Sequence, residues 1–213
     1  MVSSKPFTSN AEWFDEQNYP FNKLDVALEI FGNAAEANAY CLDSNSRIGW
    51  IYQQLLKLYA PFVIPDIFSN VLILDADTIF LNPVSFLGSK AQGLYNYGFE
   101  NCQPYFEFMS RLLPGLKKVF PFISGISEDL FLAIQSQYSL GGWKALSRCI
   151  DHKYLYGSPL SEYEIYFNFV FTWSDQMLLR RLKWVNLNNI EVIPQYQKIG
   201  YHYVSCHSFL RSS

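Results

Sequence analysis

The strongest constraint on the fold is a short apolar run that ends in two acids. Val71-Leu72-Ile73-Leu74 leads directly into Asp75-Ala76-Asp77-Thr78. Four consecutive branched apolar residues predict a strand buried on both faces, as in the parallel sheet of an α/β fold. An ionised carboxylate is costly to bury without a partner, so we expect Asp75 and Asp77 to emerge at the carboxyl end of this strand. That edge is where open α/β sheets bind ligands.

The two acids also predict a metal site. Carboxylates at positions i and i+2 point to the same side of an extended backbone. Asp75 and Asp77 together offer hard oxygen ligands for Mg²⁺ or Mn²⁺, and an ion held there would bind phosphates. The alternative is a turn in which Asp is favoured by its local hydrogen bonds. The apolar run before the acids and Thr78 after them favour a metal or nucleotide site.

Composition limits the class of protein. The chain has 213 residues, 50% hydrophobic and 16% charged, which predicts a single domain over residues 1–213. A net charge of −3 with scattered basic residues argues against a nucleic-acid partner. From the sequence we expect no transmembrane segment and no signal peptide. The cysteines are far apart, which favours reduced thiols and a cytoplasmic protein. A peripheral location at the inner face of the membrane is the alternative.

Residues 46–60 have the periodicity of an amphipathic helix. Its apolar stripe consists of Ile48, Ile51, Leu55 and Leu58. The opposite stripe consists of Trp50, Gln53, Gln54 and Lys57. An aromatic ring, two amides and a cation suit contact with a polar ligand, and a solvated helix face is the alternative.

The rest of the chain alternates between strand and helix patterns. Strands are expected over residues 94–97 and 199–206, and helices over residues 104–113, 128–138, 142–151 and 162–172. Interleaved strands and helices predict an α/β fold with a mainly parallel sheet flanked by helices.

A second pair of acids opens the predicted helix at residue 162. Ser161 and Glu164 fit the S-x-x-E capping box, so we expect Glu164 to serve the helix end. Glu162 is then the better candidate for a catalytic base. A first-turn glutamate favoured by the helix dipole is the alternative for Glu162.

With these motifs in place, the chain resembles nucleotide-sugar-dependent glycosyltransferases of the GT-A fold, whose signature is D-x-D after an apolar strand. More specifically, it looks like a bacterial-type branch with G-W-x-x-Q-Q, S-G-I, S-E-Y-E-x-Y and Y-V-S-x-H motifs. The matching segments are residues 49–54, 124–126, 161–166 and 203–207. The resemblance extends over about residues 14–211.

The resemblance implies a metal site built from distant parts of the chain. Asp77 would ligate Mn²⁺ or Mg²⁺ bridging the donor diphosphate, and Asp75 would bind the donor ribose, or the metal through water. His207 would supply a late metal ligand, with His202 as the weaker candidate.

The resemblance also implies contacts to the two substrates. Lys57 and Gln54 would reach the nucleotide-sugar donor from their helix, and Ser124 and Gly125 would contact it from the S-G-I loop. Glu162 would deprotonate the acceptor, a saccharide or another hydroxyl compound.

Two alternatives stay open. Only 74 residues precede Asp75, so the first nucleotide-binding βα unit is expected to be incomplete. Ser127 follows the S-G-I loop directly, without the histidine-containing stretch of the related branch. A degenerate, non-enzymatic relic of the fold is therefore one alternative. A haloacid-dehalogenase-type phosphohydrolase is another and ranks lower. Its D-x-D-x-T motif requires threonine at position 79, but Ile79 stands there and Thr78 directly follows Asp77.

Overall fold

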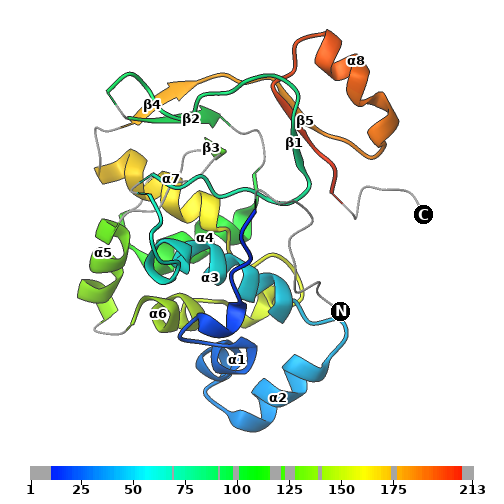
Figure 1. The fold of residues 1–213 in the computed structure, drawn as a ribbon. Helices are drawn as coiled ribbons and strands as arrows, with labels where there is room; N and C mark the ends of the chain where they lie inside the picture. The colour runs from blue at the N-terminus through cyan, green and yellow to red at the C-terminus, as the bar shows by residue number, and fades with distance from the viewer. Residues whose placement is uncertain are drawn as a thin grey trace. The chain divides into compact units, whose positions relative to one another are not determined.

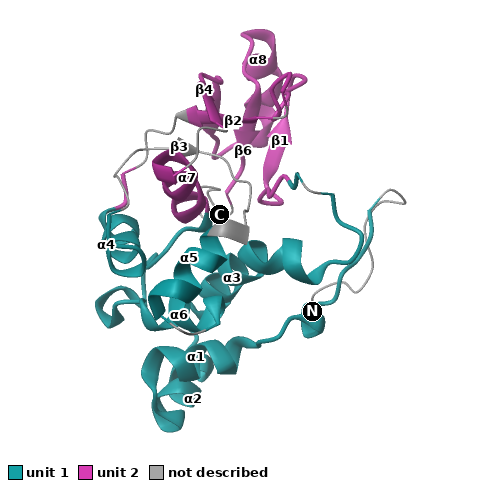
Figure 2. Cartoon of the chain, turned by 90° about the vertical axis from the view of Figure 1, so that its left-hand side faces the viewer, with its two compact units in different colours: residues 1–71, 103–115, 126–162 teal, residues 72–102, 116–125, 163–213 magenta. Residues whose placement is uncertain are grey.

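The computed structural model describes residues 11–68, 70–90, 92–97, 101–115, 121–122, 128–138, 141–173 and 177–207. These residues form a mixed α/β structure with small sheets (Figure 1). The chain divides into two compact units that alternate along the sequence (Figure 2). Unit 1 contains residues 1–71, 103–115 and 126–162, and unit 2 contains residues 72–102, 116–125 and 163–213. No helix in the described ranges is long and apolar enough to cross a membrane.

Unit 1 is helical in its described residues. Its α-helices are α1 (Lys23–Phe31), α2 (Ala34–Leu42), α3 (Ile48–Val63), α4 (Gln103–Leu112), α5 (Glu128–Tyr138) and α6 (Gly142–Arg148). Short 3₁₀ turns lie at η1 (Glu16–Asn18) and η2 (His152–Tyr154). Asn22 and Asn33 start α1 and α2 by accepting backbone N–H groups of the first turn.

The apolar stripe predicted on α3 is confirmed. Ile51, Leu55 and Leu58 are at most 1% exposed, and Ile48 is 6% exposed. The opposite stripe is not a uniform ligand-facing surface, because Gln54 is itself buried at 4% exposure. A helix packed on more than one side buries residues that a two-sided wheel assigns to solvent.

Unit 2 contains two small mixed sheets. One has the order β1 (Thr78–Phe80), β6 (Tyr203–Ser205), β5 (Trp184–Asn186), with β1 antiparallel and β5 parallel to β6. The other has the order β3 (Pro121–Phe122), β2 (Gly93–Tyr97), β4 (Met177–Arg180), with β3 antiparallel and β4 parallel to β2.

The helices of unit 2 lie in the second half of the chain. Helix α7 (Glu162–Trp173) enters unit 2 at residue 163, and η3 (Ile190–Val192) leads into α8 (Ile193–Lys198). Beside the first sheet, an apolar cluster contains Leu81, Leu187, Val204 and Cys206. This packing fixes the ends of β1 and β6, which carry the candidate site.

The strand predicted at residues 71–74 is wrong. No strand is assigned to residues 71–75, and Leu72 and Leu74 are 38% and 41% exposed, whereas Val71 and Ile73 are half-buried. An apolar run alone cannot show whether both faces are covered. Strand β1 begins only at Thr78, so Asp75 and Asp77 precede a strand instead of following one.

Candidate functional site

Asp75, Ala76 and Asp77 form a turn that leads into β1. The Thr78 N–H donates to the Asp75 carbonyl at 3.1 Å. Thr78 lies opposite Ser205 in the antiparallel pair of β1 and β6. The next residue after β6, Cys206, donates its N–H to the Asp77 carbonyl at 3.0 Å. The main chain therefore holds the end of β6 against the acidic turn.

This arrangement brings together Asp77 and His207. The Asp77 Oδ2 atom lies 2.7 Å from His207 Nδ1, and the two side chains are 25% and 24% exposed. The second carboxylate oxygen, Asp77 Oδ1, is buried and has no hydrogen-bond partner among the residues that the structure describes. A buried carboxylate oxygen without a donor is costly, and a bound cation is one way to satisfy it.

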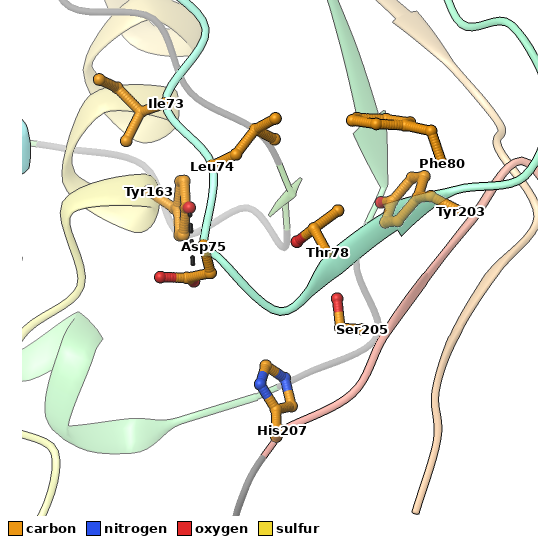
Figure 3. Close-up of a pocket in the computed structure, with 9 residues that line it drawn as sticks. All are labelled: Ile73, Leu74, Asp75, Thr78, Phe80, Tyr163, Tyr203, Ser205 and His207. Atoms are coloured by element: carbon orange, nitrogen blue, oxygen red, sulfur yellow. Dashed lines mark hydrogen bonds between the residues drawn. The ribbon is translucent and has the colours of Figure 1, made fainter. Parts of the chain in front are cut away.

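Asp75 faces a different neighbour. The Tyr163 hydroxyl, from α7, donates to Asp75 Oδ2 at the long distance of 3.5 Å (Figure 3). Both residues line a pocket of unit 2, whose other lining residues are Ile73, Leu74, Thr78, Phe80, Tyr203, Ser205 and His207. The space that water-sized molecules can enter there is about 30 Å³, room for about two waters. The enclosed part of the pocket is thus of a size for an ion and its water, and a sugar nucleotide would extend outside it.

The predicted metal ligands can be tested against this geometry. Within the described ranges, no group of three or more His, Cys, Asp or Glu residues is placed to hold a metal ion. The spacing of Asp77 and His207 is compatible with a two-ligand site. Two ligand atoms about 2.1 Å from one ion and at right angles to each other lie about 3.0 Å apart, close to the 2.7 Å between Asp77 Oδ2 and His207 Nδ1. Mg²⁺ and similar ions commonly use one or two protein ligands and complete their shell with water and phosphate.

The predicted donor and catalytic residues Lys57, Gln54 and Glu162 gather within unit 1. Lys57 Nζ lies 2.7 Å from Glu162 Oε1, and the side chains are 12% and 3% exposed. The Glu162 N–H donates to Gln54 Oε1 at 3.4 Å. The arrangement pairs a half-buried cation with a buried carboxylate and connects α3 to the first residue of α7. As placed, Lys57 and Glu162 are engaged with each other, so contact with a substrate requires this ion pair to open.

Other predicted residues do not join either cluster. His202 Nδ1 accepts the Lys183 N–H at 3.1 Å, which gives this ring a structural contact outside the Asp77 site. The Glu164 carboxylate accepts the Asn168 amide at 3.1 Å, and its proposed capping of α7 remains a prediction. Ser124 and Gly125 lie outside the described residues.

His207 was predicted from the sequence, but the pocket residues Tyr203, Ser205 and Tyr163 were not. Tyr203, Ser205 and His207 all line the pocket, as expected for residues at i, i+2 and i+4 of an extended segment. The alternation in Y-V-S-x-H therefore pointed to Tyr203 and Ser205 as well as His207. Tyr163 lies between Glu162 and Glu164, and no sequence pattern distinguished it from a core tyrosine.

No protein-family model matches the sequence, and the search of curated proteins found none significantly similar to it. The functional inference therefore depends on the motifs and on the geometry of the two clusters.

Proposed function

We propose that the protein is a metal-dependent glycosyltransferase of the GT-A type, which transfers a sugar from a nucleotide-diphosphate donor to a glycan or another hydroxyl acceptor. One observation carries the proposal. Asp77 from the D-x-D motif and His207 from the late Y-V-S-x-H motif lie 2.7 Å apart although they are 130 positions apart in sequence. These are the two residues that the resemblance assigned to one metal ion.

The residues of unit 2 support a division of roles. Asp77 and His207 would hold Mn²⁺ or Mg²⁺, which when bound supplies positive charge to the departing nucleoside diphosphate. Asp75, oriented by the Tyr163 hydroxyl, presents a carboxylate that can accept hydrogen bonds from a ribose. The hydroxyls of Thr78 and Ser205 lie in the same pocket and can donate or accept.

Lys57 and Glu162 keep their proposed roles as donor contact and acceptor base. Their 2.7 Å ion pair holds both side chains in defined positions. Opening of this ion pair would free Lys57 to contact an anionic group and Glu162 to accept a proton from a hydroxyl. The GT-A form of the sheet is part of the same proposal, and the parallel pairs β2–β4 and β5–β6 support it.

The proposal is tested by thermal-shift titration with UDP, GDP and their sugars, with Mn²⁺ or with EDTA. A ligand at a hundred times its Kd stabilises a protein by about 2.7 kcal/mol. We expect a shift that requires Mn²⁺ and disappears in Asp77→Ala. Glu191→Gln, an exposed carboxylate of unit 2, is the matched control and should respond like wild type. No response to any nucleotide would reject the proposal in favour of a relic that has lost donor binding.

A further inference from the structure

Unit 2 contains a second set of buried polar atoms, separate from Asp77 and His207. Four side-chain atoms of Asn96, Arg180 and Tyr203 are buried and make no hydrogen bond within the described part of the chain: Asn96 Nδ2, Arg180 Nε, Arg180 Nη2 and the Tyr203 hydroxyl. Each of these atoms carries at least one hydrogen to donate. Buried donors in folded proteins nearly always have an acceptor, so such a set points to an acceptor that the described residues do not supply.

The two Arg180 atoms form one functional edge. Nε and Nη2 lie on the same side of the planar guanidinium and make the fork that binds two oxygens of a carboxylate or phosphate. The guanidinium lies over the Phe86 ring, 5.3 Å from its centroid, which fixes the plane of the fork. Burial lowers the pKa of Arg180, and the nearby Tyr203 offsets this only in part. An arginine keeps its charge in proteins, so an anion compensates the buried Nε and Nη2 edge of Arg180 better than a water molecule does.

Asn96 and Tyr203 extend the same donor surface. Asn96 and Arg180 are register partners on β2 and β4, so their side chains leave the sheet on one side. Asn96 Oδ1 accepts the Leu182 N–H at 2.8 Å, which fixes the amide and leaves its NH₂ group facing elsewhere. The Tyr203 ring is stacked on Trp184, with centroids 5.9 Å apart and planes inclined by 5°.

The three side chains are also close to one another. Burial raises the pKa of the Tyr203 hydroxyl, and the neighbouring Asn96 amide and Arg180 guanidinium lower it by less. The amide therefore lies near the hydroxyl without forming a hydrogen bond of normal geometry. Tyr203 is 2% exposed and Asn96 is 1% exposed, so the donors that approach one another here are shielded from water.

We propose that Asn96, Arg180 and Tyr203 form a binding site for a small oxyanion, held by the Arg180 fork and completed by the amide and hydroxyl donors. Phosphate and carboxylate share the required chemistry, since both present two acceptor oxygens on one side. The site does not depend on a divalent ion or on the proposed transferase activity. Its residues line the interior of unit 2, and only Tyr203 also lines the pocket shown in Figure 3.

The test is a thermal-shift and ³¹P NMR titration of the full chain with inorganic phosphate in EDTA, with acetate as the carboxylate probe and potassium chloride at equal ionic strength. We expect saturable stabilisation by phosphate or acetate that chloride does not reproduce. Arg180→Lys keeps the charge but removes the fork, and should raise the Kd at least about tenfold. Tyr203→Phe removes one neutral donor and should raise it about threefold. Arg181→Met, an exposed neighbour, should leave the Kd within about twofold of wild type.

Asp77→Ala separates this site from the proposed metal site, since it should bind phosphate in EDTA as wild type does. The ³¹P titration of wild-type protein gives the result even if an Arg180 variant fails to fold. The inference is overturned if neither anion binds saturably in EDTA, if Arg180→Lys binds as tightly as wild type, or if binding requires Mn²⁺ and is lost in Asp77→Ala. Buried water would then be what satisfies the donors.

Discussion

Asp77 and His207 are connected twice, through side chains and through the adjoining main chain. The 2.7 Å contact between Asp77 Oδ2 and His207 Nδ1 is accompanied by a 3.0 Å hydrogen bond from the Cys206 N–H to the Asp77 carbonyl. The position of the carboxylate is thus set by β6 as much as by its own turn. This is why a motif 130 residues away in sequence belongs to the candidate site.

The first prediction concerns the coupling between these two side chains. In a double-mutant cycle with Asp77→Asn and His207→Gln, measured by urea unfolding at pH 7 in EDTA, we expect a coupling energy of about 1 kcal/mol. The value is modest because about a quarter of each side chain is exposed to water. Strictly additive effects would contradict a direct interaction.

Removing one partner of the ion pair between Lys57 and Glu162 should lower stability more than removing both partners. Lys57→Met removes the cation that faces a carboxylate of 3% exposure, and we expect a loss of about 3 kcal/mol in unfolding free energy. The double variant Lys57→Met/Glu162→Leu should recover much of that loss. Lys144→Met, whose side chain is 43% exposed, should cost far less. A double variant less stable than Lys57→Met would show that the charge pairing is not what stabilises this contact.

Glu29 should make the stability of the protein depend on acid pH. Burial raises the pKa of Glu29, but hydrogen bonds and charges from Arg148 and Lys144 outweigh it and hold the pKa below the ordinary 4.5. Because the folded pKa is the lower one, the contribution is complete above the unfolded pKa and is lost as pH falls through 4.5 and then through the folded pKa.

The comparison is with Glu29→Gln, using denaturant unfolding at several pH values between neutral and strongly acidic. We expect the stability advantage of wild type over the variant to be constant near neutrality and to shrink on acidification. An advantage that stays constant or grows as pH falls would contradict the assigned ion pairs.

At the start of α6, alanine should destabilise the protein at position 142 but not at position 141. A Cβ at Gly142 would lie 2.3 Å from Cδ1 of Phe131 and 3.0 Å from the Tyr59 hydroxyl, whereas a Cβ at Gly141 would meet nothing within 4 Å. We expect Gly142→Ala to lower the melting temperature, at a cost of about 1–3 kcal/mol. Gly141→Ala should change stability by less than about 0.5 kcal/mol. Equal effects would mean that α5 and α6 do not pack as described.

Periodic segments were predictable because their burial pattern is local. The helix expected at residues 128–138 corresponds to α5 (Glu128–Tyr138), and those at 104–113, 142–151 and 162–172 correspond to α4, α6 and α7 with shifted ends. The strand expected at 94–97 lies within β2 (Gly93–Tyr97). In each case the apolar residues recur at the spacing of the element itself.

Elements that depend on distant partners were not predictable in this way. The run at residues 71–74 is apolar enough for a buried strand, yet its cover comes from one face only, as the exposed Leu72 and Leu74 show. The strands β4 and β5, as well as α1, α2 and α8, went unpredicted. In the candidate site, Asp77 and His207 came from motifs, whereas the pairing of Lys57 with Glu162 required knowledge of how α3 meets the start of α7.

The most direct measurement of the central claim is a titration with Mn²⁺ followed by the loss of the free-ion EPR signal. We predict one ion bound per chain, with affinity weakened at least about tenfold in both Asp77→Asn and His207→Gln and unchanged in Glu191→Gln. No binding at millimolar Mn²⁺, or binding that both site variants retain, would contradict the assignment of Asp77 and His207 as ligands of one metal ion.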